Sequence, residues 1–160
     1  FLRALREEVQ KLHSNGVRFR VVGDVSVLGA ETRSLIEEAE ALTAANSRLC
    51  LNVAVNYGGR WDIEQAVAKA TAAGESAAFA QWLSFAGQPD PDLFIRTGGE
   101  RRVSNFMLWQ LAYTELYFSD ILWPDFDEAE LASALAWFAG RERRFGKTGE
   151  QVRVLSTTPV

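Results

Sequence analysis

The sequence has few of the residues that most often bind metals or form cross-links. Its 160 residues include one cysteine, Cys50, one histidine, His13, and one methionine, Met107. A single cysteine excludes a disulfide within the chain and is typical of proteins of the reducing cytosol. Because no cysteine or carboxylate cluster surrounds the single histidine, we interpret His13 as a structural residue at a helix end.

Basic charge and long apolar runs are also missing. The formal net charge is −4 at pH 7, so no overall positive field would attract nucleic acid, and any anion site has to be local. The apolar runs are far shorter than the roughly 20 residues that span a bilayer, and no signal peptide pattern is present. These absences predict a cytoplasmic protein, which would meet any membrane lipid from the inner face of the membrane.

The residues that are present suit one soluble α/β domain, with 48% hydrophobic and 24% charged residues. Apolar runs that end in glycine turns alternate with amphipathic segments, which predicts a parallel β-sheet covered by helices. We assign the domain to residues 1–150 and expect a frayed tail over 151–160. Helices are predicted over 1–13, 31–44, 63–73 and from 127 to about 140–144, and strands over 17–22, 49–55 and from 93.

Burial can also be predicted from the pattern of each element. The strand over 49–55 is almost continuously apolar and is predicted to be buried on both faces. The helix over 31–44 is predicted to bury Leu35, Ile36, Ala39 and Leu42 and to expose Glu37, Glu38 and Glu40. A helical stretch near residue 80 is interpreted as mainly core: Phe79, Trp82, Leu83 and Phe85. The last helix begins with a D-x-x-E capping box at Asp127 and is predicted to bury Leu131, Leu135 and Phe138.

Two strand ends carry candidate site residues in the first half of the chain. Asp24 follows the first strand, where an ordinary turn aspartate is the preferred interpretation over a site residue. The second strand runs into Asn56-Tyr57-Gly58-Gly59-Arg60, a glycine turn with an arginine, and Asp62 is predicted to be the N-cap of the next helix. Alone, this turn is a weak indication of an anion site.

The turn after the strand at 93 is a stronger candidate. Arg96 and Arg102 flank two glycines, Gly98 and Gly99, and Ser104 adds a hydroxyl group. Guanidinium groups, a hydroxyl and the free N–H groups of a glycine turn are the donors that bind a phosphate or diphosphate. Glu115 could hold the Mg²⁺ that accompanies a diphosphate. A surface turn with solvated arginines is the alternative.

The whole stretch from Asp92 to Phe126 resembles a signature of the cis-prenyltransferases of the undecaprenyl diphosphate synthase type. That signature is D-L-x-I-R-T-x-G-E-x-R-x-S-N-F-x-x-W-Q-x-x-Y-x-E-x-x-F, followed by W-P-x-F, and the chain matches it without a break in spacing. The N-Y-G-G-R segment that begins at Asn56 resembles an internal motif of the same family. Arg144-Phe145-Gly146 matches the R-x-G tripeptide near the family's C-terminus.

The resemblance implies condensation of isopentenyl diphosphate with an allylic diphosphate of the farnesyl type. The product would be a long-chain polyprenyl diphosphate such as undecaprenyl diphosphate, the precursor of the lipid carrier for cell-wall glycans, although the signature leaves the chain length open. By position, Arg96, Arg102 and Ser104 would bind isopentenyl diphosphate, with Asn56 as a further substrate-binding residue. Glu115 would coordinate Mg²⁺, and Gly146 would reach the partner's diphosphate site in a homodimer.

One departure from the family bears on activity. The family's motif H-x-x-x-M-D-G-N-R-R-W-A, whose aspartate is catalytic and binds Mg²⁺, has no match in these 160 residues, and neither has S-x-E-N-x-x-R-P. The chain opens on Phe1 within a helical pattern, and we interpret this start as a cut, with the C-terminal two thirds of the family's domain present. We therefore name no catalytic residue and expect no turnover from this chain alone.

Two alternatives to an enzyme remain open. The first is a catalytically inactive, truncated or partner-type subunit that acts as a diphosphate-binding and dimerisation module. The missing aspartate motif favours this reading, whereas the intact arginine, serine and glutamate positions favour the enzyme. The second is an unrelated phosphate-binding α/β protein.

Overall fold

The computed structural model describes residues 2–142, with the backbone alone for residues 2–6. The chain divides into two compact units, Phe1–Gln88 and Pro89–Val160, and each is described by itself. Gly146 and the tail over 151–160 lie outside the described residues, as do the predictions made for them. No helix among the described residues is both long enough and apolar enough to cross a membrane.

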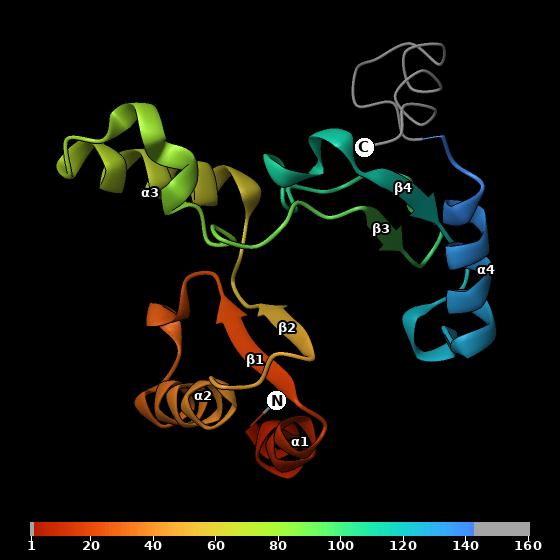
Figure 1. Cartoon of the computed structure of the whole chain (residues 1–160), viewed down its shortest axis with the longest axis horizontal. Helices are drawn as coiled ribbons and strands as arrows, with labels where there is room; N and C mark the ends of the chain where they lie inside the picture. The colour runs from red at the N-terminus through yellow and green to blue at the C-terminus, as the bar shows by residue number, and fades with distance from the viewer. Residues whose placement is uncertain (1, 143–160) are drawn as a thin grey trace, which may run out of the picture. The chain divides into compact units, whose positions relative to one another are not determined.

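The first unit contains a parallel strand pair with helices on β1. Strands β1 (Val17–Val22) and β2 (Leu49–Ala54) pair in parallel, and helices α1 (Leu2–Ser14) and α2 (Ala30–Thr43) pack on β1 (Figure 1). The core is formed by Phe19, Ile36 and Ala39. The predicted parallel α/β architecture is confirmed here, and the bounds of these elements agree with the prediction to within two residues.

The free edge of β1 is covered by side chains of α2. The backbone N–H of Phe19 donates to Thr43 Oγ1 at 3.0 Å, and that of Val21 donates to Glu40 Oε1 at 2.7 Å. Glu40 was predicted to lie on the exposed side of its helix, but it is half-buried and its carboxylate binds a backbone amide of β1. A strand edge without a neighbouring strand needs acceptors for its amides, and the carboxylate of Glu40 provides one of them.

The prediction that the second strand is buried on both faces was also wrong. Leu49 and Leu51 are 59% and 37% exposed. They lie opposite Val17 and Phe19 in the strand register, but the helices pack mainly on β1 and leave this part of β2 uncovered. Leu42 of α2, predicted to be buried, is exposed as well.

Helix α3 (Gly59–Ala72) begins earlier than predicted, and Asp62 is not its N-cap. The cap is Gly58, and Asp62 lies in the first turn of the helix, only 1% exposed. Its carboxylate accepts hydrogen bonds from Tyr57 Oη at 2.9 Å, Gln65 Nε2 at 3.0 Å, Ser84 N at 2.8 Å and Ser84 Oγ at 2.7 Å. Asp62 therefore joins the turn before α3 to the segment that follows it.

The aromatic-rich stretch near residue 80 forms the 3₁₀ segment η2 (Ser76–Trp82) rather than a regular helix. Leu83 is buried as predicted. Phe85 contacts Tyr57 edge-on, with ring centroids 5.5 Å apart. The stretch is therefore core at Leu83, whereas Phe79, Trp82 and Phe85 are only half-buried.

The second unit contains another parallel strand pair, β3 (Leu93–Arg96) and β4 (Glu115–Phe118). Helix α4 (Glu128–Ala139) packs on β4, with Trp137 5.4 Å from Tyr117 between ring centroids (Figure 1). Asp127 is confirmed as the N-cap of the capping box, because its carboxylate accepts a hydrogen bond from the N–H of Glu130 at 3.0 Å. The remaining elements are short 3₁₀ segments: η1 (Val25–Val27) in the first unit, and η3 (Gln110–Tyr113) and η4 (Trp123–Asp125) in the second.

The buried face of α4 differs from the prediction. Leu131 and Leu135 are exposed, and the fully buried residue of the helix is Ala134. Leu131 and Leu135 are therefore available to a partner, whereas Trp137 and Phe138 are half-buried.

We predict that Gly23→Ala lowers the free energy of unfolding by about 3 kcal/mol. Gly23 has φ of 118°, and a Cβ on it would lie 2.1 Å from the carbonyl oxygen of Val55. Gly74→Ala is the matched control, because Gly74 has φ of 75° but nothing within 4 Å of the new Cβ. Chemical denaturation should show a loss of only about 1 kcal/mol for the control. Equal losses in the two variants would contradict the close approach at Gly23.

We predict that Asp62→Ala lowers the free energy of unfolding by about 3 kcal/mol, because it leaves several buried donors without an acceptor. Asp62→Asn keeps the shape and one acceptor oxygen, and should lie between this variant and wild type. Asp90→Ala removes an exposed aspartate of the linker and should stay near wild type. Urea denaturation followed by circular dichroism would measure all three. A free energy of unfolding for Asp62→Ala close to that of wild type would contradict the role of Asp62 in joining the two segments.

Candidate functional site

The turn after β3 is tied to the segment that follows β4. Gly98 and Gly99 have φ of 87° and 77°, so both adopt the left-handed conformation that favours glycine. Their N–H groups donate to the carbonyl oxygens of Ile121 at 2.8 Å and Ser119 at 3.0 Å. The prediction that these N–H groups would be free to bind a ligand was therefore wrong, and the donors of the candidate site are side chains.

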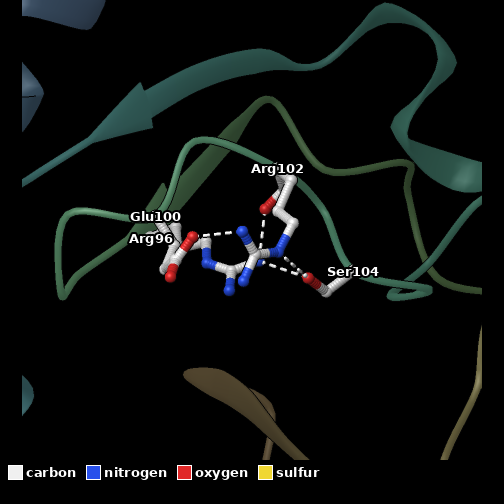
Figure 2. Close-up of polar contacts among 4 residues, drawn as sticks. All are labelled: Arg96, Glu100, Arg102 and Ser104. Carbon is white, nitrogen blue, oxygen red and sulfur yellow. Dashed lines mark hydrogen bonds and ion pairs between the residues drawn. The ribbon is translucent and has the colours of Figure 1, made fainter.

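The structure brings Arg96, Arg102 and Ser104 together (Figure 2). Ser104 Oγ accepts hydrogen bonds from Arg96 Nη1 at 2.8 Å and from Arg102 Nε at 3.1 Å. Arg96 Nη1 also donates to the backbone carbonyl of Arg102. These contacts hold two guanidinium groups beside one hydroxyl at the C-terminal end of β3, as the sequence predicts.

The hydroxyl of Ser104 can still donate a hydrogen bond. It accepts from two arginines, and none of the hydrogen bonds among residues 2–142 uses its own hydrogen. Its φ is 47°, followed by 61° at Asn105. Such values are uncommon for residues other than glycine, cost about 1–3 kcal/mol each and are found most often at functional sites. The strained turn thus supports a binding role for Ser104.

Glu100 completes the cluster, and the sequence analysis gave it no role. Its carboxylate forms an ion pair with Arg102 Nη1. In Figure 2, Glu100 and Ser104 lie on opposite sides of the Arg102 guanidinium. The only indication in the sequence is the spacing of two residues between Glu100 and Arg102. That spacing is compatible with a contact but does not require one.

Glu115 lies at the other end of the strand pair. It is opposite Leu93 in the register, whereas Arg96 is opposite Phe118, so about 10 Å of strand separates the two positions. The Glu115 carboxylate accepts a hydrogen bond from Arg141 Nε at 3.0 Å, and its side chain is 20% exposed. No group of three or more metal-binding side chains occurs in the described part of the chain.

Arg141 lies two residues beyond the end of α4. The structure adds two contacts to that position: the ion pair with Glu115 and a place over the ring of Trp137, 5.2 Å from its centroid. A separation of 26 residues between Arg141 and Glu115 leaves no local pattern that could have revealed their contact.

Asn56 and Asp24 meet at the carboxyl ends of β1 and β2, in the first unit. Asn56 Nδ2 donates to the backbone carbonyl of Asp24 at 3.2 Å, and Asn56 has φ of 46°. The Asp24 carboxylate accepts hydrogen bonds from the side chain and the backbone N–H of Ser26, and these lower its pKa. Asp24 is thus a turn residue, as preferred from the sequence. The amide nitrogen of Asn56 is engaged in the same turn.

The second unit therefore presents a small cationic site that suits a phosphate or diphosphate. Arg96 and Arg102 supply charge and planar arrays of donors, and Ser104 can supply one further donor. The Glu100 carboxylate pairs with Arg102, and none of the contacts described here gives the cluster a nucleophile or a general base. On its own this arrangement can bind an anion and stabilise its negative charge.

Comparisons with known proteins agree with this site. The family described as "Putative undecaprenyl diphosphate synthase" matches residues 1–146. An isoprenyl transferase of Nitrosomonas europaea is 57% identical over 95% of the chain and 60% of its own length. A ditrans,polycis-undecaprenyl-diphosphate synthase ((2E,6E)-farnesyl-diphosphate specific) of Vibrio vulnificus is 48% identical over 97% of the chain and 66% of its own length.

Solved structures show the same fold. The crystal structure of a probable undecaprenyl diphosphate synthase from Campylobacter jejuni matches with a TM-score of 0.81 and 36% identity, over 91% of this chain and 70% of that one. The crystal structure of lavandulyl diphosphate synthase from Lavandula x intermedia, in complex with dimethylallyl diphosphate, matches with a TM-score of 0.83 and 40% identity. The match covers 91% of this chain and 68% of that one.

The chain thus spans about three fifths of the Nitrosomonas relative. The relatives named here are transferases and synthases, so they give no support to the alternative of an inactive subunit. The extent of the matches also excludes an unrelated phosphate-binding protein. The chain belongs to the undecaprenyl diphosphate synthase family of cis-prenyltransferases.

Proposed function

We propose that this chain supplies the isopentenyl diphosphate site of a cis-prenyltransferase. The reaction would condense isopentenyl diphosphate with an allylic diphosphate of the farnesyl type and so extend a polyprenyl diphosphate. The observation that carries this proposal is the convergence of Arg96 and Arg102 on Ser104 Oγ. A diphosphate carries several negative oxygens, and two guanidinium groups with a hydroxyl donor would bind it and neutralise its charge.

The proposed product is a long-chain polyprenyl diphosphate such as undecaprenyl diphosphate, the precursor of the carrier lipid for cell-wall glycans. The name of the Vibrio relative supports this product and a farnesyl primer. The plant relative was solved with dimethylallyl diphosphate, so allylic diphosphates of more than one size suit this family. The motifs expected to bind the allylic diphosphate are not among these 160 residues, and the present site accounts for the isopentenyl half of the reaction.

We propose that Mg²⁺ accompanies the diphosphate and that Glu115 would help to hold it. One carboxylate suits this ion, because Mg²⁺ commonly takes most of its ligands from phosphate oxygens and water. When bound, the ion would stabilise the negative charge that develops on a leaving diphosphate. In the structure the Glu115 carboxylate pairs with Arg141 and lies at the opposite end of the strand pair from Arg96, about 10 Å of strand away. Arg141 would therefore have to release at least part of the carboxylate, and the ion would have to link Glu115 to the diphosphate across that distance.

We also propose that the protein acts as a homodimer in the cytoplasm, with peripheral membrane contact through its lipid product. The second unit exposes several large apolar side chains that a partner subunit could cover: Trp109, Tyr113, Leu122, Trp123, Leu131 and Leu135. Exposed apolar surface of this kind is typical of interaction sites. Gly146 of the R-x-G tripeptide would contribute to the partner's diphosphate site, and Asn56 to substrate binding.

We predict that Arg96→Ala and Arg102→Ala each weaken the binding of inorganic pyrophosphate by roughly 10- to 100-fold, the loss expected for one charge-assisted hydrogen bond. Ser104→Ala removes a neutral donor and should weaken binding by roughly 3- to 10-fold. Arg102→Lys keeps the charge without the planar fork and should lie between wild type and Arg102→Ala.

Isothermal titration calorimetry of the full chain at fixed ionic strength measures these affinities. Arg18→Ala is the matched control, because it removes an exposed arginine from β1 in the first unit. Its affinity for pyrophosphate should stay within about twofold of wild type. A loss in Arg18→Ala equal to that in Arg102→Ala would indicate a general charge effect and contradict the proposed site.

A further inference from the structure

We propose that Glu100 is an internal anion that competes with the diphosphate for Arg102 and so limits the affinity of the site. This inference rests on the proposed function, since it concerns the same site. Its basis is the ion pair between the Glu100 carboxylate and Arg102 Nη1, on the side of the guanidinium opposite Ser104 (Figure 2).

The competition follows from the shape of the two anions. A carboxylate and a phosphate both present oxygens that match the fork of a guanidinium group. Arg102 Nε already donates to Ser104 Oγ, so the Nη groups are the donors of Arg102 that remain for a ligand. Glu100 occupies one of them. A diphosphate that approaches the same nitrogen meets a carboxylate of like charge and has to displace it.

The pair can open at low cost. The Arg102 and Glu100 side chains are 62% and 50% exposed, and ion pairs in such positions stabilise a protein little, because water screens and replaces them. The carboxylate can therefore rotate into solvent when a stronger anion arrives. Arg96 is different, because it contacts Ser104 Oγ and the Arg102 carbonyl and none of its contacts here is with a carboxylate.

The pair also has an effect in the ligand-free site. Arg96 and Arg102 both donate to Ser104 Oγ, so two positive charges lie close together. The negative charge of Glu100 offsets part of their repulsion. The cost is weaker binding and faster release of the diphosphate than two uncompensated arginines would give, which suits a site that has to empty after each turnover.

A simpler role for Glu100 would be to orient Arg102 without opposing the ligand. The two roles predict opposite effects of Glu100→Gln, which keeps the size of the side chain and one acceptor oxygen but removes the charge. If Glu100 competes, the variant should bind pyrophosphate more tightly. If Glu100 only orients Arg102, the variant should bind with the same or lower affinity.

The test is calorimetric titration of the full chain with inorganic pyrophosphate, without Mg²⁺ and at low, fixed ionic strength. We expect Glu100→Gln to bind roughly 3- to 10-fold more tightly than wild type, the range expected when one exposed opposing charge is removed. Glu128→Gln is the matched control, because it removes the same charge from an exposed position in the first turn of α4. It should stay within about twofold of wild type.

A double-mutant cycle with Arg102→Ala tests whether the effect passes through this arginine. In the Arg102→Ala background, the gain from Glu100→Gln should fall to the level of the Glu128→Gln control. The proposal would be overturned by unchanged or weaker binding in Glu100→Gln, by an equal gain in Glu128→Gln, or by a gain that persists without Arg102.

The result for the wild-type chain separates this inference from the proposed function. If the wild-type chain binds pyrophosphate and Arg96→Ala weakens this binding, the proposed site is supported regardless of the result for Glu100→Gln. Glu100→Gln then tests only the competition at Arg102. If neither wild type nor Glu100→Gln binds pyrophosphate, the site itself is wrong, and the competition at Arg102 fails with it.

Discussion

The shared acceptor at Ser104 Oγ is the contact on which the candidate site depends. Two guanidinium groups repel each other, and here both donate to one hydroxyl, from Arg96 Nη1 and Arg102 Nε. The turn that carries them is held by backbone hydrogen bonds from Gly98 and Gly99 to the segment after β4. The site is thus built on a parallel strand pair, and Ser104, in the left-handed conformation, is held by the hydrogen bonds that its Oγ accepts from both arginines.

Much of the fold and of the candidate site could be predicted from local sequence patterns. The alternation of apolar runs and glycine turns gives the parallel strands, and the bounds of β1 were predicted to the residue because a short run of apolar and basic residues lies between Gly16 and Gly23. The cap at Asp127 follows from its spacing to Glu130. The convergence of Arg96, Arg102 and Ser104 follows from nine residues around one tight turn, a distance over which spacing determines which side chains can meet.

What could not be predicted depends on contacts between distant residues or on the direction of backbone groups. Glu40 binds the edge of β1 from 19 residues away, and Arg141 reaches Glu115 across 26. Nothing in a glycine pair tells whether its N–H groups face a ligand or a neighbouring carbonyl. The exposure of Leu49 depends on which strand the helices cover, and an apolar pattern alone does not contain that information.

Nuclear magnetic resonance of the arginine side chains tests the central claim most directly, because it reports on each guanidinium group by itself. During titration of the full chain with inorganic pyrophosphate, the Nε–Hε signals of Arg96 and Arg102 should shift together and saturate at one ligand concentration. Those of Arg18 and Arg20 on β1 should stay in place. Saturable shifts at Arg18 and Arg20, with none at Arg96 and Arg102, would contradict a diphosphate site at Ser104.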